Sequence, residues 1–331
     1  MVIYVLGLAL ATVVTLSASI PIRWLALRYG VLDRPANHKS HLTPVPYLGG
    51  VAIWLGLVVS LAVVAPEQKR IPALLTVLLL LGLADDVFGA KVATKLVIEV
   101  AVAVAVVGLG FVWRITDSYP LDIAISVLWI VGLTNAFNLL DNMDGLTSTV
   151  AVAGLIGLAL LNHGVAPFAL AMSGALIGFL YWNRPPARMF MGDAGSLMVG
   201  FSLAVATITV ANIDHGLHSV ALLFGPVAVA IFDTSLVVVS RILAGLPIQT
   251  GGRDHFSHRL IVVGWSRERI LLAAFLAAVL GDAIAFLASS YPNPMAWLAV
   301  PIATAGITAW AWMLRIDPYS AKIRLVDAAG A

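Results

Sequence analysis

The sequence contains no cysteine and few charged residues, and each shortage excludes a class of protein. Without cysteine the chain can form no disulfide bond and has no thiolate to act as a nucleophile or metal ligand. Only 11% of its residues are charged, whereas roughly a quarter are charged in a typical soluble domain. Neither a Walker A loop nor an EF-hand fits the stretches "MGDAGS" and "NMDGL". An ordinary soluble enzyme is therefore excluded.

Apolar runs fill most of the chain, and we expect eleven of them to cross a membrane, since a bilayer core of about 30 Å takes roughly 20 helical residues. They lie near Val2–Leu25, Leu48–Ala65, Pro72–Ala84, Leu96–Trp113, Leu121–Leu140, Thr149–Leu161, Ala166–Trp182, Ser196–Ile213, Ser219–Leu243, Ile270–Ser289 and Met295–Leu314. The first run lacks a basic leader and a cleavage site, so we expect it to stay as a span. The sequence predicts an all-α polytopic membrane protein with about 10–11 transmembrane helices, in which residues 1–331 form a single integral membrane domain.

Positive charge distinguishes the two sides of this predicted domain. Eleven spans place the termini on opposite sides of the membrane. If the loop after the first span is cytoplasmic, then of the 19 lysines and arginines only Lys69, Arg70 and Arg114 lie on the other side. This positive-inside bias predicts a cytoplasmic C-terminus.

Polar residues collect in five clusters at span ends, and all five fall on the predicted cytoplasmic side. They read "DRPANHKSHLTPVPYLGG", "LADDVFGAKVATK", "NAFNLLDNMDGL", "NRPPARMFMGDAGSL" and "GGRDHFSHRL". The opposite loops carry no comparable density of acids. The pattern favours a site at the cytoplasmic membrane surface over a pathway across the bilayer.

Two adjacent aspartates, Asp85 and Asp86, end the third apolar run. A solvated helix end would explain such a pair, but adjacent carboxylates repel each other at an apolar boundary. A basic partner, Lys91 or Lys95, or a bound divalent metal would relieve that repulsion.

The stretch "NAFNLLDNMDGL" places several oxygen ligands close together. Spacings of three to four residues put Asn138 and Asp141, with Asn142 or Asp144, on one helical face. A polar helix cap that ends at Gly145 would explain only part of this set. The stretch is a candidate for binding a cation or a nucleotide.

The stretch "FMGDAGS" sets Asp193 between Gly192 and Gly195 just before a span. The glycines let a backbone approach a ligand, and the following helix N-terminus offers N–H groups to phosphate. By itself, however, the stretch is explained as well by Asp193 capping the helix.

The last cluster gathers two arginines and two histidines within seven residues: Arg253, His255, His258 and Arg259. The histidines have the spacing of metal ligands on one helical turn, but only Asp254 could complete a zinc set. A clamp for phosphate groups fits the arginines and histidines better. Acids for Mg²⁺ together with basic groups for anionic oxygens are what phosphoryl transfer requires.

From about Asp33 to Leu260 the sequence closely resembles the polyprenyl-phosphate N-acetylhexosamine-1-phosphate transferases. The matching motifs are "DRP…HKSH…TPVPYLGG", "ADDVFG…TK", "NAFNLLDNMDGL", "NRPPARMFMGDAGSL", "FDT" at residues 232–234 and "DHFSHRL". The resemblance implies a multi-pass enzyme of the bacterial plasma membrane with a cytoplasmic active site. Such an enzyme transfers a sugar phosphate from a UDP-sugar to polyprenyl phosphate, releases UMP, and requires Mg²⁺, for which Mn²⁺ can substitute. It has no nucleic-acid partner, and because family members are often dimeric, the resemblance leaves both a monomer and a homodimer open.

The resemblance also implies roles for individual residues. Asp85 would be the base that keeps the lipid phosphate ionised and Asp86 would set the metal–diphosphate geometry, although the two could exchange roles. Mg²⁺ would be bound by Asp193 and Asn138. The nucleotide pocket would be lined by Asp141, Asp144, Asn183, Phe190 and Gly192, with the Phe190 ring stacked on uracil. Phosphate groups would be held by Lys95, Arg253, His255, His258 and Arg259. Lys39 and His41 belong to a matched motif without an assigned role.

Two positions depart from the family's D-[KR]-x-H-x-H-H run, because Gly252 replaces the leading acid and Ser257 the middle histidine. These changes make a UDP-MurNAc-pentapeptide donor, and hence a phospho-MurNAc-pentapeptide transferase of peptidoglycan synthesis, the alternative. A UDP-GlcNAc-type donor, used to start a cell-wall or surface polysaccharide, is the main prediction.

The alternative from a different class is an ion-coupled secondary transporter, with Glu99, Asp233 and Asp282 as its intramembrane acids. Such a protein should distribute acids along a midplane route and often shows repeat symmetry, which the sequence lacks. For Asp233 we expect a structural role about two turns from Arg241. An intramembrane aspartyl protease needs two facing aspartates within the bilayer, whereas the acids here are more numerous and lie at span ends.

Overall fold

The computed structural model of the chain describes residues 2–33, 44–68, 70–213, 217–249, 252–290 and 295–319. In these ranges the protein is almost entirely helical, and its only sheet pairs the two-residue strands β1 (Leu32–Asp33) and β2 (Val45–Pro46). The helices are α1 (Val2–Tyr29), α2 (Gly49–Val64), α3 (Arg70–Phe88), α4 (Val92–Gly108), α5 (Tyr119–Leu140), α6 (Leu146–Leu161), α7 (Ala166–Asn183), α8 (Gly192–Ala211), α9 (Leu217–Phe224), α10 (Ala228–Leu243), α11 (Phe256–Val262), α12 (Arg267–Ser290) and α13 (Met295–Leu314).

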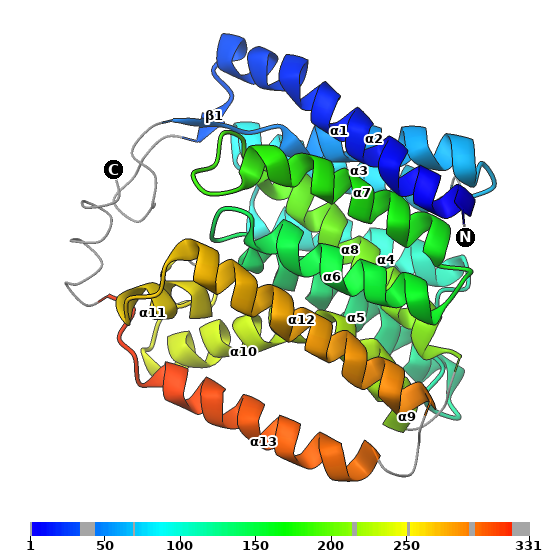
Figure 1. Ribbon diagram of the computed structural model, residues 1–331, viewed down its shortest axis with the longest axis vertical. Helices are drawn as coiled ribbons and strands as arrows, with labels where there is room; N and C mark the ends of the chain where they lie inside the picture. Colours follow the sequence, from blue (N-terminus) through cyan, green and yellow to red (C-terminus); the bar gives the residue numbers. More distant parts are fainter. Residues whose placement is uncertain are drawn as a thin grey trace.

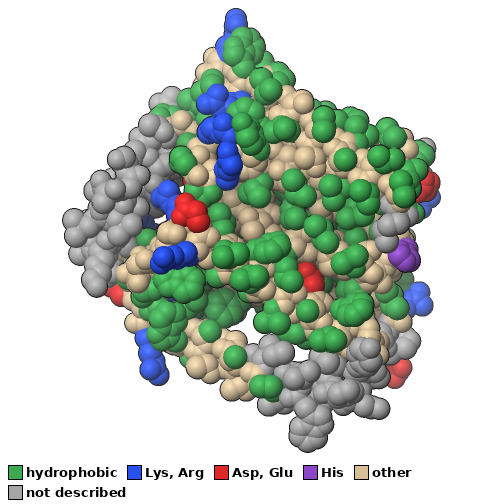
Figure 2. Space-filling model, viewed as in Figure 1, with side chains coloured by type: hydrophobic (Ala, Val, Ile, Leu, Met, Phe, Trp, Pro, Cys, Tyr) green, Lys and Arg blue, Asp and Glu red, His purple; other side chains and the backbone are tan. Residues whose placement is uncertain are grey.

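A helix lies at each of the eleven predicted spans, and the all-α polytopic fold is confirmed. Within the described ranges, seven helical segments are long and apolar enough to cross a membrane, and α2 and α6 are shorter apolar helices. Figure 1 shows the long helices lying side by side. In Figure 2, hydrophobic side chains spread over the middle of the visible face, while most lysine and arginine side chains lie toward one edge.

Two spans differ in detail from the prediction. The ninth is interrupted, because α9 ends at Phe224 and a 3-10 turn, η1 (Gly225–Val227), precedes α10. Pro226 in that turn has no N–H to continue the helical ladder. The third span is longer than predicted, since α3 continues to Phe88 and therefore contains Asp85 and Asp86 in its last turn.

Helix α8 lies at the centre of the bundle. Of an 18-residue apolar stretch of α8, 94% is buried inside the protein, whereas only 22% of the corresponding stretch of α1 is buried. Glycines on the neighbouring helices let their backbones reach its N-terminus. A Cβ at Gly82 of α3 would lie 2.2 Å from the backbone nitrogen of Ala194, and one at Gly50 of α2 would lie 2.5 Å from that of Gly195. This close packing fixes the start of α8 against two other helices.

The ends of α3, α5 and α7 and the start of α8 meet at one end of the bundle, beside the β1–β2 pair (Figure 1). The loop that precedes α11 reaches the same end. The predicted clusters therefore gather as expected, except that Arg34, Lys39 and His41 lie outside the described residues.

Candidate active site

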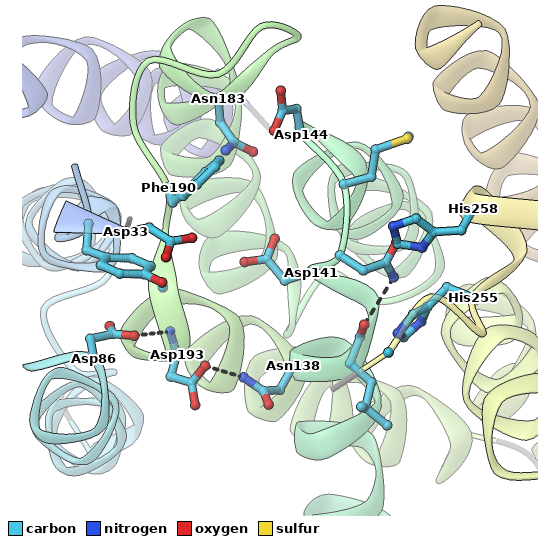
Figure 3. Close-up of a pocket in the computed structure, with 16 residues that line it drawn as sticks. Asp33, Asp86, Asn138, Asp141, Asp144, Asn183, Phe190, Asp193, His255 and His258 are labelled. Atoms are coloured by element: carbon cyan, nitrogen blue, oxygen red, sulfur yellow. Dashed lines mark hydrogen bonds between the residues drawn. The ribbon is translucent and has the colours of Figure 1, made fainter. Parts of the chain in front are cut away.

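A cavity of about 330 Å³ opens at this end of the bundle (Figure 3). In the described part of the chain it is lined by Asp33, Tyr47, Asp86, Asn138, Leu139, Asp141, Asn142, Met143, Asp144, Asn183, Phe190, Gly192, Asp193, Gly252, His255 and His258. Most of the residues predicted from the sequence are among them. The exceptions are Asp85, Lys95, Arg253 and Arg259, which do not line the cavity.

Asp85 and Lys95 lie beside the cavity and reach it through Asp193. The ammonium group of Lys95 is 2.7 Å from Asp85 Oδ2 and also contacts Asp193 Oδ2. Asp85 Oδ1 accepts a hydrogen bond from the backbone of Ala90 at 2.5 Å. Of the two lysines considered for the aspartate pair, Lys95 is the one that contacts Asp85. Its single positive charge is shared between the carboxylates of Asp85 and Asp193.

Asp86 caps the helix that carries Asp193. Its Oδ1 accepts the backbone N–H of Asp193 at 2.9 Å and its Oδ2 accepts that of Ala194 at 3.3 Å. Gly192 has a φ of +67°, and a Cβ there would lie 2.3 Å from the Asp86 carboxylate. The cap of α8 is therefore Asp86 and not Asp193, and these two N–H groups are not available to a phosphate.

Asn138 approaches Asp193 from the last turns of α5. Its Nδ2 donates to Asp193 Oδ1 at 2.9 Å and to Ser196 Oγ at 2.9 Å. The side-chain carbonyl oxygen of Asn138 accepts no hydrogen bond from the described residues. Figure 3 shows Asn138, Asp193 and Asp86 along one side of the cavity.

Carboxylates dominate the charge of the cavity lining. Asp33, Asp86, Asp141, Asp144 and Asp193 line it, and none of its described lining residues is a lysine or arginine. Burial, together with the nearby carboxylates Asp193, Asp86 and Asp144, raises the pKa of Asp141 to about 7. A cavity with this excess of negative charge is suited to a cation.

The donor set fits Mg²⁺ better than a metal enclosed by protein ligands alone. No group of three or more histidine and acidic side chains in the described ranges is arranged to bind a metal by itself. Mg²⁺, however, usually keeps several waters and takes one or two carboxylates together with substrate phosphates. Asp193 with the carbonyl oxygen of Asn138 meets that requirement.

On the opposite side of the cavity, His255 is held by Asp233 of α10. Its Nδ1 lies 2.7 Å from Asp233 Oδ2, and Asp233 Oδ1 accepts the backbone N–H of Phe256 at 2.9 Å. Asp233 is fully buried. We expected a structural role for Asp233, about two turns from Arg241 on α10, and the partners that the structure gives it are His255 and the backbone of Phe256 at the start of α11. Its position in the "FDT" motif was the only signal in the sequence.

His258 is a neutral member of this side of the cavity. Burial, and then the neighbouring His255, lower its pKa to about 3. Its Nδ1 is buried without a hydrogen-bond partner in the described structure. His258 can therefore donate or accept a hydrogen bond in the cavity that it lines, and its contact with a phosphate group stays a prediction.

Arg259 supports the loop and does not reach the cavity. Its guanidinium donates to Asp254 O at 2.9 Å, to Met313 O at 2.8 Å, to Ile316 O at 2.5 Å and to Ser240 Oγ at 2.7 Å. These bonds tie α10, α11 and the end of α13 together. The position of Arg259 gives it a structural role in place of the predicted phosphate contact, and Arg253 also lies away from the cavity lining.

The two positions that depart from the family pattern are both explained by contacts of this chain. A Cβ at Gly252 would lie 2.7 Å from Asp254 Oδ2 and 2.8 Å from Tyr319 Oη. Tyr319 follows α13 and donates to Asp254 Oδ2 at 3.2 Å. Ser257 Oγ donates to Asn142 Oδ1 at 2.5 Å, which joins the histidine loop to the end of α5.

The remaining wall holds the residues predicted to contact a nucleotide. Asn183 accepts the N–H of Gly145 at 2.9 Å and donates to Met189 O at 3.0 Å, and Asp144 Oδ2 accepts the N–H of Ala187 at 2.9 Å. These bonds fix the loop that carries Phe190.

Phe190 faces a second ring, Tyr47, at a centroid distance of 6.3 Å. Tyr47 and Asp33 were not predicted as site residues. They belong to the first polar cluster, whose matched motif was the available signal, and the β1–β2 pair brings that cluster to the cavity.

The acids named for the transporter alternative have separate surroundings. Glu99 accepts a hydrogen bond from Asn135, Asp233 holds His255, and the Asp282 carboxylate packs against Gly157 of α6. They do not share a cavity among those described, whereas the carboxylates at the end of the bundle do.

Comparison with known proteins gives a consistent result. Residues 71–211 match the model of the family described as glycosyl transferase family 4. The chain is 32% identical over 273 residues to the probable undecaprenyl-phosphate N-acetylglucosaminyl 1-phosphate transferase of Bacillus subtilis, a match that covers 77% of this chain and 76% of that protein. It is 30% identical over 313 residues to the decaprenyl-phosphate N-acetylglucosaminephosphotransferase of Mycobacterium tuberculosis, covering 80% and 78%. A phospho-N-acetylmuramoyl-pentapeptide-transferase of Carboxydothermus hydrogenoformans is 33% identical over 303 residues, covering 78% and 90%.

Proposed function

The chain belongs to glycosyl transferase family 4, and from this premise we propose that it is a polyprenyl-phosphate sugar-phosphate transferase. It transfers GlcNAc-1-phosphate from UDP-GlcNAc to undecaprenyl or a similar polyprenyl phosphate. An oxygen of the lipid phosphate attacks the β-phosphorus of the donor, the bond from that phosphorus to the bridging oxygen breaks, and UMP leaves. The product is a polyprenyl-diphosphate sugar that starts a cell-wall or surface polysaccharide.

The observation that carries this proposal is a carboxylate-lined cavity at the end of an apolar helical bundle. A lipid phosphate anchored in the membrane and a soluble nucleotide can meet only at such a surface. We assign this end to the cytoplasmic face of a bacterial plasma membrane, where the positive-inside pattern also places the C-terminus. A homodimer stays a prediction.

Asp193 and Asn138 are the residues that would hold Mg²⁺. When bound, the ion neutralises the donor diphosphate and the charge that develops as UMP leaves. Asp86 keeps the backbone of Asp193 in place through the cap, and Lys95 holds its second carboxylate oxygen. Phe190 and Tyr47 offer aromatic faces to the uracil, and Asp141 and Asp144 offer acceptors to the nucleoside.

The acceptor needs little help to become a nucleophile. A phosphate monoester has a second pKa of about 6, so most of it is dianionic near pH 7. Asp85 is paired with Lys95 and does not line the cavity, which favours a role in orienting Lys95 over the role of general base. The Asp233–His255 pair directs the remaining ring nitrogen, Nε2, to a phosphate oxygen or its proton.

A donor panel tests the proposal. Purified protein is incubated with polyprenyl phosphate, Mg²⁺ and each of several radiolabelled UDP-sugars, including UDP-MurNAc-pentapeptide. We expect a labelled lipid and stoichiometric UMP with UDP-GlcNAc. Turnover of UDP-MurNAc-pentapeptide in its place would assign the chain to the alternative donor. Absence of product with every UDP-N-acetylhexosamine would contradict the function.

A further inference from the structure

Four arginines lie at the cavity end of α1 and α7, on the outside of the bundle. Arg23 and Arg28 belong to the last two turns of α1, and Arg184 and Arg188 follow the end of α7. Arg28, Arg184 and Arg188 are exposed and Arg23 is half-buried. We call these four residues the arginine patch. Figure 2 shows lysine and arginine side chains in a column over this edge of the molecule.

Close packing of α1 and α7 brings the two halves of the patch together. At Gly174 and Gly178 of α7, a Cβ would lie only 2.1 and 2.4 Å from backbone oxygens of α1. The two helices continue in register to their ends, where Arg23 Nε donates to the backbone oxygen of Arg188 at 3.0 Å. The patch is therefore assembled by the fold from segments more than 150 residues apart, since this bond spans 165 positions.

The guanidinium groups are held in place by aromatic rings. Arg188 lies over Tyr181 and Trp182 at 4.5 and 4.8 Å, Arg184 over Tyr181 at 5.3 Å, and Arg28 over Trp24 at 5.1 Å. Arg188 also donates to Tyr181 O at 2.6 Å. Because these side chains are already ordered, a ligand that binds them loses less conformational entropy than it would on freely moving lysines.

Among the described residues, no acidic side chain forms an ion pair with the patch. The ion pairs found among the described residues involve Lys95, Arg241 and His255, and none involves an arginine of the patch. Next to the patch, α1 exposes an apolar surface at Val13, Ile20, Leu25 and Leu27. Positive charge above exposed apolar side chains, with tryptophan and tyrosine at the boundary, matches the cross-section of a phospholipid.

We propose that the arginine patch binds the phosphodiester headgroup of an anionic membrane phospholipid, whose acyl chains lie along the apolar surface of α1. Arginine is suited to this headgroup because it can donate two hydrogen bonds to one phosphate. A soluble phosphate compound would not use the apolar surface.

One loop of the protein connects the arginine patch to the cavity. The loop that carries Arg184 and Arg188 on its outer side donates the N–H of Ala187 to Asp144 and carries Phe190 on its inner side. A lipid that orders the outer side of this loop orders one wall of the cavity.

Native mass spectrometry of the purified full chain tests lipid binding without reference to catalysis. The protein is equilibrated with equal amounts of phosphatidylglycerol and phosphatidylcholine, and the retained lipids are counted. The test variant is Arg28→Gln/Arg184→Gln/Arg188→Gln. The control is Arg267→Gln/Arg269→Gln/Arg315→Gln, which makes the same charge change at the same end of the bundle, on α12 and after α13. Arg28→Gln/Arg184→Gln serves as a milder variant, because neither side chain makes a hydrogen bond to the described protein.

We expect the wild type and the control to retain phosphatidylglycerol selectively. The triple patch variant should retain about tenfold less phosphatidylglycerol than the wild type. The milder variant should lose part of it with an unchanged melting temperature. Equal losses in the patch and control variants would overturn the proposal, since net charge alone would then explain binding. The proposal would also fail if the patch variant retained phosphatidylglycerol but lost polyprenyl phosphate.

Discussion

The carboxylate of Asp86 accepts the backbone N–H of Asp193 at 2.9 Å. This bond joins the end of α3 to the start of α8 and makes one aspartate the support of another. Gly82, one turn before Asp86 on the same face of α3, allows the approach because a side chain there would collide with Ala194. The two acids thus have different tasks, and substitutions should separate them.

We expect Asp86→Ala to lower both stability and metal binding. Loss of a helix cap costs about 1 kcal/mol, which corresponds to a fall of about 2–4 °C in the melting temperature. Displacement of Asp193 should also reduce the stabilisation by added Mn²⁺ in the same thermal scan. Asp86→Asn, which keeps one acceptor oxygen, should retain more of both. If Asp86→Asn were inactive with an unchanged melting temperature, the charge of Asp86 and not its cap would be essential.

Lys95→Met should bind divalent metal more tightly than the wild type. The Lys95 ammonium contacts the carboxylates of both Asp85 and Asp193, so it competes with a cation for the Asp193 carboxylate. Without it, the metal-free protein should melt at a lower temperature, and Mn²⁺ should raise that temperature by more than it does in the wild type. Electron paramagnetic resonance of Mn²⁺ gives the affinity directly. An unchanged or weaker affinity would show that Lys95 does not compete at this site.

The helical framework could be predicted because it follows from composition alone. A long apolar run such as Val2–Leu25 must be helical in a bilayer to satisfy its backbone, and it forms α1. The grouping of Asp141 and Asp193 was also predictable, since Asp141 follows one predicted span and Asp193 precedes another on the same side of the membrane. The break at Pro226 was missed because the apolar pattern continues through it.

The partners of polar residues could not be predicted in the same way. Asp86 caps α8 only because Gly82 lets α3 and α8 touch. Arg259 points away from the cavity because carbonyl oxygens near the end of α13 accept hydrogen bonds from its guanidinium group. His255 pairs with Asp233, which lies 22 positions earlier in the sequence. Each pairing depends on how distant segments pack, and residue type and spacing do not contain that information.

Asp233→Asn should lower kcat with little change in KM. The asparagine oxygen can still accept the N–H of Phe256, but its amide no longer accepts the Nδ1 proton, so the imidazole takes the other tautomer. Loss of positioned proton transfer typically costs about 10²-fold or more. The double variant Asp233→Asn/His255→Gln should be no slower than His255→Gln alone. Additive losses would mean that the two residues act independently.

The stability of the metal-free protein should depend on pH through Asp141. Its pKa in the folded cavity is raised to about 7, above about 3.9 in an unfolded chain. The folded state therefore binds a proton more tightly. The stability that protonated Asp141 contributes to the folded state is fully present below about pH 4 and is lost as the pH rises through about 7.

Asp141→Asn removes that titration. In EDTA, its melting temperature should exceed that of the wild type by about 2–4 °C at pH 8.5, and the difference should shrink at pH 5.5. A difference that is the same at both pH values would contradict the raised pKa of Asp141.

The most direct test of a metal-dependent transferase site in this cavity is UMP release from UDP-GlcNAc and polyprenyl phosphate. It is measured as a function of Mg²⁺ concentration in the wild type and in Asp193→Asn. Asp193→Asn keeps the backbone N–H groups that Asp86 caps, so the variant should fold with a near-normal melting temperature. We expect the wild type to release UMP only when Mg²⁺ is present, to stop on addition of EDTA, and to exceed Asp193→Asn by at least about 10²-fold. Normal turnover in Asp193→Asn, or turnover by the wild type in EDTA, would contradict the assignment of this cavity as a metal-dependent sugar-phosphate transferase site.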